Sequence, residues 1–152
     1  MAGAIPPEAE EFLCNHPRAF LLTLRRDGSP TAHPMTAIFR DGVLYFNTYR
    51  KSAKVRNIER DPRVSCLVTT SDDDPEPRGV VLDGTAEVLP GDALPSFAAE
   101  ASPGAARLPK ERGVSEGVLS RIEDRLRSGK RVLVRIRPER VRIFGRLGSA
   151  GS

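Results

Sequence analysis

The amino-acid sequence predicts a mainly β protein, a small antiparallel barrel of about six strands with short helices between some of them. Runs rich in Val, Leu, Thr and aromatic residues have the usual length of strands. Two Asp-Gly pairs, Asp27-Gly28 and Asp41-Gly42, separate the first of these runs as hairpin turns do. The sequence contains no GxGxxG or GxxxxGKS/T motif, which argues against a doubly wound nucleotide-binding sheet.

The length of 152 residues is that of one ordinary domain, and we expect a single barrel domain over residues 1–152. The sequence has no apolar run long enough to cross a bilayer. Its first residues also lack the basic and apolar regions of a secretory signal. We therefore expect a soluble, cytoplasmic protein.

The first half of the chain is expected to form a helix, a meander and a second helix. The prolines in the stretch PPEAEEFLCNHP suit a helix start, which predicts an N-terminal helix within residues 1–16. The hairpin turns and β-rich runs of residues 18–49 predict three antiparallel strands in a meander. Residues 52–61 are predicted to form a short amphipathic helix that ends before Pro62.

The second half is expected to complete the barrel. Strands are predicted over residues 63–70 and 78–89, with Gly84 marking a bulge or a tight bend. Further along we expect a helix over 92–101, a mobile loop over 102–114 and a helix over 118–126 closed by Gly129. A last strand over 131–145, broken or bent at Pro138, and a flexible tail over 147–152 complete the chain.

The stretch TYRKSAKVRNIERDP, residues 48–62, carries the clearest sign of a ligand site. Ser52 can cap the predicted helix by accepting a hydrogen bond from the amide of Lys54 or Val55. Free amides and the positive end of the helix dipole suit an anion, phosphate above all. Lys54 adds a charge that can neutralise phosphate oxygens. Neighbouring side chains that can contribute are Asn47, Thr48, Arg50, Arg56 and Asn57.

The positive charge of the chain is clustered. The formal net charge is +4, and residues 50–63 hold six basic residues against two acidic ones. Residues 120–146 hold ten basic residues against three acidic ones. Such clusters indicate an anionic partner, although a solvated helix face produces the same pattern.

The segment DGSPTAHPMTAIFRDGVLYFNTYRKSAKVRNIERDPRVSCLV, followed by RGVVLDGTAEVL, resembles the split-barrel flavin-binding family that includes the pyridoxamine 5'-phosphate oxidases. It is particularly similar to the actinobacterial branch that uses FMN or the deazaflavin coenzyme F420. The most specific part is a strand-end hydroxyl, then Ser-x-Lys, then the helix exit NIERDPRVS. The resemblance covers about residues 12–146 and implies a six-stranded antiparallel split barrel of the FMN-binding type.

The resemblance also implies a set of site residues. It implies that Thr48, Ser52 and Lys54 bind the coenzyme phosphate. The side chains that it places around them are Asn47, Arg50, Arg56 and Asn57. It implies that His33, Pro34 and Met35 lie along the ring system. It further implies a homodimer with the coenzyme at the subunit interface, where Arg78 reaches the partner's ligand.

Departures from the pyridoxamine 5'-phosphate oxidases argue against their substrate. The ring-side strand reads HPMTAIF, without their Arg-x-x-x-x-Lys pattern, and the chain has no Trp. The predicted function is instead that of an oxidoreductase that uses F420 or FMN to transfer hydride to or from a small organic substrate. The basic clusters suit the anionic tail of F420 and also accommodate FMN, while the similarity of AKVRNIERDPR to the F420-using branch favours F420 slightly. The sequence identifies no catalytic side chain, since His33 can equally be a structural residue.

Other function classes stay open or are disfavoured. A non-catalytic binding or carrier protein for flavin, F420 or heme and other tetrapyrroles is the alternative. Nucleic-acid binding is disfavoured because the aromatic fraction is only 5% and no binding motif occurs. A metal site is not expected, since two His and two Cys are scattered without ligand spacing.

Overall fold

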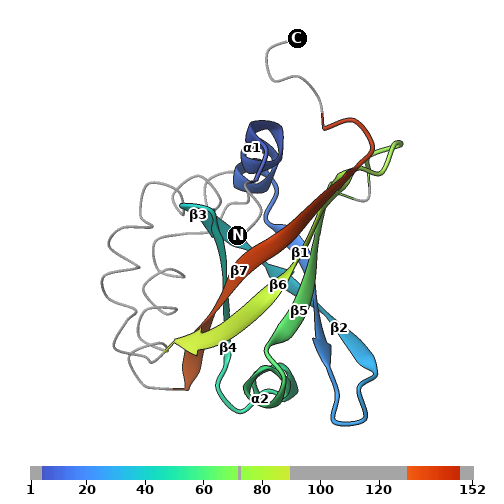
Figure 1. Ribbon diagram of the computed structural model, residues 1–152. Helices are drawn as coiled ribbons and strands as arrows, with labels where there is room; N and C mark the ends of the chain where they lie inside the picture. The colour runs from blue at the N-terminus through green and yellow to red at the C-terminus, as the bar shows by residue number, and fades with distance from the viewer. Residues whose placement is uncertain (1–4, 72, 90–129, 148–152) are drawn as a thin grey trace.

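The computed structural model describes residues 5–71, 73–89 and 130–147. These residues form two helices and seven strands (Figure 1). In chain order the elements are α1 (Pro7–Asn15), β1 (Arg18–Leu24), β2 (Pro30–Thr36), β3 (Ile38–Arg40), β4 (Val43–Tyr49), α2 (Ala53–Arg60), β5 (Arg63–Thr69), β6 (Gly79–Leu89) and β7 (Arg131–Phe144).

The strands form one antiparallel sheet in the order β2-β1-β5-β6-β7-β4-β3. The sheet is curled, so that β2 at one edge comes into contact with β4 near the other edge. Figure 1 shows α1 at one end of the curled sheet and α2 at the opposite end. The prediction of a mainly β, antiparallel barrel with short helices is therefore confirmed.

The described part of the chain contains seven strands where about six were expected. The run predicted as one middle strand of a meander is interrupted at Ala37, whose backbone N–H donates to the Pro17 carbonyl at 2.7 Å. The chain before Ala37 pairs with β1, and the chain after it pairs with β4. The three-stranded meander is thus two hairpins that lie at opposite edges of the sheet, because one continuous run crosses between them.

Both predicted Asp-Gly turns are present. Gly28 has a φ of +85°, and in the β3–β4 turn Asp41 and Gly42 have φ of +50° and +76°. Two consecutive positive φ values match the right-handed twist of a two-residue hairpin, which explains the Asp-Gly sequence. The second turn delivers the chain into β4, and the carboxyl end of β4 leads to α2.

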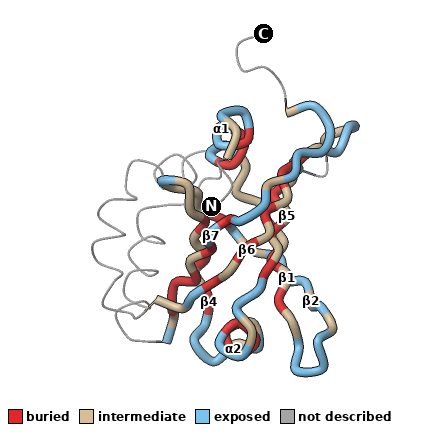
Figure 2. Tube along the Cα trace, viewed as in Figure 1, coloured by how far each residue is buried: buried red, intermediate tan, exposed pale blue. Residues whose placement is uncertain are grey.

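The core fills the inside of the curled sheet. Alternate residues of β1, β4, β5, β6 and the first half of β7 point inward and are buried, among them Leu21, Phe46, Leu82 and Ile136. Each helix adds one apolar side to the same core, as Figure 2 shows by the buried residues along the strands and on one side of each helix. The hydrophobic effect therefore positions both helices relative to the sheet.

Gly84 and Pro138 mark a bulge where β6 pairs with β7. The register shifts between Asp83 and Gly84, and a side chain at Gly84 would collide with the carbonyl oxygen of Arg137. The two backbones approach so closely here that only glycine fits at position 84. Pro138 has no backbone N–H to donate to β6, and this is tolerated because the regular hydrogen bonding is already interrupted at the bulge. The predicted bulge at Gly84 is confirmed.

The outer surface of the sheet has an apolar half and a charged half. Cross-strand pairing places Pro34, Phe20, Leu67 and Val81 in one row across four strands. The outer face of β1 is largely apolar, with Phe20, Leu22 and Leu24, and its inward residues are buried. On β7 the outward residues are mostly arginines, and several of them pair with acidic side chains of β6.

Several predicted elements lie outside the described residues: the helices over 92–101 and 118–126, the loop over 102–114, and the tail beyond residue 147. The single domain over 1–152 stays a prediction. None of the helices in the described ranges is long and apolar enough to cross a bilayer.

Candidate functional site

The start of α2 is capped by Ser52. This residue has an extended backbone, with φ of −72° and ψ of 155°, and its Oγ accepts from the Val55 amide at 3.4 Å. The predicted cap is confirmed. The first turn holds no acidic residue, so its free amides and the positive end of the helix dipole are not neutralised by the helix itself.

Asn57 and Arg60 fix α2 against β1. The Asn57 amide donates to Thr23 Oγ1 at 3.0 Å and accepts from the Arg60 guanidinium at 2.8 Å. Arg60 also donates to the Leu24 carbonyl at 3.0 Å. Both ends of the buried Asn57 amide are thus used within the protein. Its predicted contact with a ligand stays a prediction, whereas its structural role orients the helix start.

Lys54 lies in the first turn of α2, half-buried. Burial lowers the pKa of its ammonium from the ordinary 10.5, and the nearby positive charge of Arg131 lowers it further. No carboxylate forms an ion pair with Lys54 in the described ranges. An electrostatically unfavourable position of this kind becomes favourable when an anion binds.

Arg131 begins β7 and faces Tyr49 and Asn47 across the β4–β7 pairing. Its guanidinium lies over the Tyr49 ring, 4.1 Å from the centroid, and its Nη1 donates to Asn47 Oδ1 at 3.3 Å. Its Nε is buried without a hydrogen-bond partner. The ring and the amide thus hold the guanidinium in place, while its buried Nε–H has no acceptor in the protein.

His33 is on β2, opposite Leu21, with its ring half-buried. Burial lowers the pKa of the imidazole below 6.5, and the charges of Lys54 and Arg25 lower it further. Its Nε2 is buried without a partner. The imidazole is therefore mostly neutral at pH 7. Because the charge of Lys54 lowers the pKa of His33, the start of α2 and the His33 region of β2 are near each other. β2 also contacts β4, the strand that leads to α2.

Ser52, Lys54 and Arg131 form a site suited to an anion with several oxygen atoms. Lys54 and Arg131 supply two positive charges, and Ser52 still has a hydroxyl proton to donate. In the described part of the chain no cluster of three or more His, Cys, Asp or Glu can hold a metal. The donor set fits a phosphate group.

The remaining predicted residues near α2 have different surroundings. Thr48 is buried on the inner face opposite Val132. Arg56 is exposed and donates to the Lys51 carbonyl at 3.1 Å. Arg50 lines a cavity of about 400 Å³ beside Ile58 and the end of β6. On β2, Pro34 is exposed on the outer face and Met35 packs against the core.

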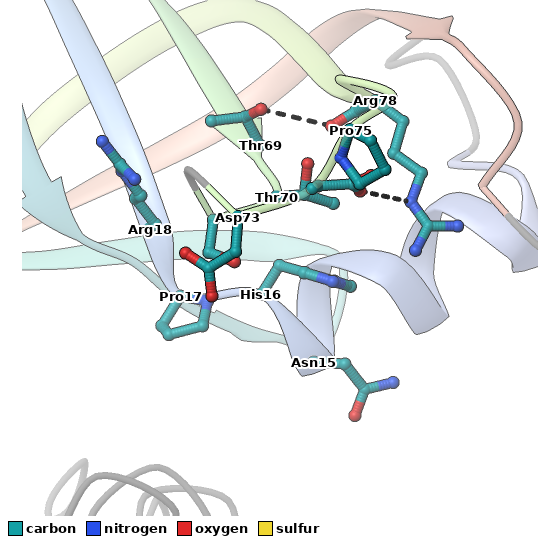
Figure 3. A pocket seen from close by; sticks show the side chains of 11 residues that line it. Asn15, His16, Pro17, Arg18, Thr69, Thr70, Asp73, Pro75 and Arg78 are labelled. Carbon is teal, nitrogen blue, oxygen red and sulfur yellow. Dashed lines mark hydrogen bonds and ion pairs between the residues drawn. The ribbon is translucent and has the colours of Figure 1, made fainter.

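Arg78 is not part of this group within one chain. It precedes Gly79, which pairs with Thr69 at the end of β5 that lies away from α2. There it lines a larger cavity of about 550 Å³ between the end of α1 and the β5–β6 loop, drawn in Figure 3. Its guanidinium pairs with Asp74 at 3.2 Å and donates to the Arg146 carbonyl at 3.3 Å. Its predicted contact was with a partner's ligand, and that stays a prediction.

Arg131 was not among the predicted site residues. Its signal was weak because the last strand contains many arginines, and only the pairing of Arg131 with Tyr49 sets it beside α2. Arg25, in the β1–β2 hairpin, was also missed, although it influences His33. The sequence of one strand does not show which of its arginines will lie beside the site, because that depends on how the strand pairs with its neighbour.

The family model for pyridoxamine 5'-phosphate oxidase matches residues 5–145, nearly the whole length. The chain belongs to the pyridoxamine 5'-phosphate oxidase family. The predicted membership in this split-barrel family is therefore confirmed. No curated protein matches the sequence.

The chain is similar over most of its length to several solved structures. A conserved hypothetical protein, Rv2991, from Mycobacterium tuberculosis is 25% identical, with a TM-score of 0.71 over 99% of this chain and 95% of that one. A FAD-binding protein from Mesorhizobium loti is 26% identical, with a TM-score of 0.60 over 91% and 92%. An F420 reductase is 23% identical, with a TM-score of 0.61 over 91% and 98%, and shows a common fold.

We predict that His33 makes the free energy of unfolding depend on pH. Its pKa is lower in the folded protein than the 6.5 of the unfolded chain, because burial and nearby cations disfavour its charge. The unfolded chain then binds more protons as pH falls from 6.5 toward the folded pKa, so stability is lost over that range. Urea unfolding at pH 7, 6 and 5, in a buffer without phosphate, measures this loss.

The matched variant is His33→Gln, which cannot take up the proton. The wild type should lose more stability than the variant between pH 7 and pH 5. Equal losses in the two proteins would show that the His33 environment is not cationic and buried.

Proposed function

We propose that this protein is an oxidoreductase that binds F420 or FMN and acts on a small organic substrate. One observation carries the proposal: strand pairing and the Ser52–Tyr49 backbone hydrogen bond set Arg131 beside the capped start of α2, where Lys54 lies, and neither cation has a carboxylate partner in the described ranges. Family membership supports a flavin-type coenzyme, as does the likeness to a FAD-binding protein. When bound, the coenzyme supplies the hydride chemistry.

The residues of the chain have distinct tasks in this proposal. Ser52 donates its hydroxyl to the coenzyme phosphate while its lone pair caps the helix. Lys54 neutralises the phosphate charge. The β2 segment of His33, Pro34 and Met35 lies along the ring system, where the neutral imidazole of His33 presents an unpartnered Nε2. Because the coenzyme brings the reactive group, the protein has only to position it and to exclude water.

We also propose a homodimer that encloses the coenzyme at the subunit interface. The inner face of the sheet packs against the core, but its outer face carries a row of apolar side chains that are not fully buried: Pro34, Phe20, Leu67 and Val81. A second copy that covers this row removes apolar area from water. In such a dimer the partner subunit's Arg78 is the residue proposed to reach the ligand.

The alternative function is a carrier that binds flavin, F420 or heme without turnover. Parallel titrations of the purified protein with FMN, F420 and heme, followed by absorbance, identify the ligand. An enzyme is expected to bleach or restore the coenzyme band when a substrate from a broad panel is added. Tight binding of heme in preference to both other ligands, or binding without turnover across the panel, would favour the carrier.

Lys54→Ala is predicted to weaken coenzyme binding by about 1.5 to 3 kcal/mol, the usual contribution of a hydrogen bond to a charged group. Fluorescence or calorimetric titration with FMN and with F420 measures the change. The control is Lys51→Ala, which removes an exposed charge one residue before the cap and should have a small effect. Unchanged affinity of Lys54→Ala for both coenzymes would contradict the proposed phosphate site.

Leu67→Arg is predicted to convert the dimer into a monomer, since it places a charge in the middle of the apolar row. Sedimentation at micromolar concentration measures the mass of the wild type and of the variant. The control is Glu10→Arg, an exposed change on α1 that should leave the dimer intact. A monomeric wild type would be incompatible with the proposed assembly.

A further inference from the structure

Arg131 differs from several other arginines on the outer face of β7 in its lack of an acidic partner. Arg135 and Arg137 both pair with Glu87, and Arg142 pairs with Asp83. Arg131 instead contacts a neutral amide and an aromatic ring. No carboxylate neutralises its charge within the described ranges.

The Arg131 guanidinium is fixed before any ligand arrives. The guanidinium lies over the Tyr49 ring, and its Nη1 donates to Asn47 Oδ1. Both contacts come from the adjacent strand β4, which therefore fixes the position of the guanidinium. Its Nε is buried and makes no hydrogen bond. An unpaired buried donor is costly, which is unusual for a purely structural arginine. The planar guanidinium presents further N–H groups in a fixed fork that suits phosphate oxygens.

The neighbourhood of Lys54 gives the second reason. Tyr49 pairs with Arg131 and its carbonyl accepts from the Ser52 N–H at 3.1 Å, so the start of β7 lies beside the start of α2. In this half-buried setting the charge of Arg131 also lowers the pKa of the Lys54 ammonium. The two cations come from different elements, since Lys54 is in the first turn of α2 and Arg131 begins β7. Two like charges in such a place are repulsive until an anion lies between them.

We propose that Arg131 is the second phosphate-binding cation of the coenzyme site, and that one phosphate group bridges Arg131 on β7 and Lys54 on α2. Tyr49 and Asn47 are its positioning residues. The inference rests on the proposed coenzyme function and deepens it, because it makes the site selective for the phosphate-bearing form of a ring system. The phosphate monoester of FMN and the phosphodiester of F420 share the chemistry that these two cations recognise.

The test compares ligands with and without phosphate. Arg131→Gln keeps a polar side chain that can donate hydrogen bonds, although a shorter one, and removes the charge. It should weaken binding of the preferred coenzyme, FMN or F420, about 10-fold to 100-fold, the range expected for charge-assisted hydrogen bonds. Its affinity for the phosphate-free counterpart, riboflavin or the corresponding deazaflavin, should be unchanged. Arg131→Lys, which keeps the charge but loses the planar fork, should give an intermediate loss.

The matched control is Arg135→Gln, on the same strand and face, whose arginine is paired with Glu87. It should bind both ligand forms as the wild type does. Tyr49→Leu should weaken only the phosphate-bearing ligand, whereas Tyr49→Phe, which retains the ring under the guanidinium, should not.

Two results overturn the inference. Equal loss of the phosphate-bearing and phosphate-free ligands in Arg131→Gln would assign Arg131 a structural role. Wild-type affinity in Arg131→Gln together with weakened binding in Lys54→Ala would leave the phosphate site in place without Arg131. Wild-type affinity in both variants would instead remove the proposed function itself, so the two failures are distinguishable.

Discussion

Repulsion between Lys54 and Arg131 is the interaction on which the account of this protein depends. Folding brings both cations into a half-buried place and gives neither of them a carboxylate partner in the described part of the chain. Buried or half-buried charges are normally paired, because desolvation disfavours them. A protein that keeps such a pair, beside the free amides of a capped helix, is prepared for an anionic ligand.

The fold produces this arrangement through ordinary packing. Curling of the sheet brings β2 toward β4, the β4–β7 ladder sets Arg131 opposite Tyr49, and Val55 and Ile58 anchor α2 in the core. The hydrogen bond between Asn57 and Thr23 then fixes the direction in which the helix start points. Val55, Asn57 and Ile58 therefore hold α2 in place without having to contact a ligand. The proposed ligand contacts are made by other residues, such as Ser52 and Lys54.

Local signals in the sequence predicted local structure well. The Ser52 cap, the Asp-Gly turns and the bulge at Gly84 each depend on a few neighbouring residues, and the structure has all of them. The break at Ala37 and the role of Arg131 were not predictable in this way, because both depend on which strands pair across the curled sheet. The strand pattern predicted the barrel and the Ser52 cap predicted the helix start, and the family resemblance implied both again. The predicted contact of Arg78 concerns a second chain.

The most direct test of the central claim is the pKa of Lys54, measured by NMR of its side chain in the free protein and with the preferred coenzyme bound. In the free protein the pKa should lie below 10.5, because burial and Arg131 disfavour the charged ammonium. On binding of FMN or F420 it should rise, since the phosphate reverses the local potential. An ordinary pKa in the free protein, or no change on saturation with the coenzyme, would contradict the account.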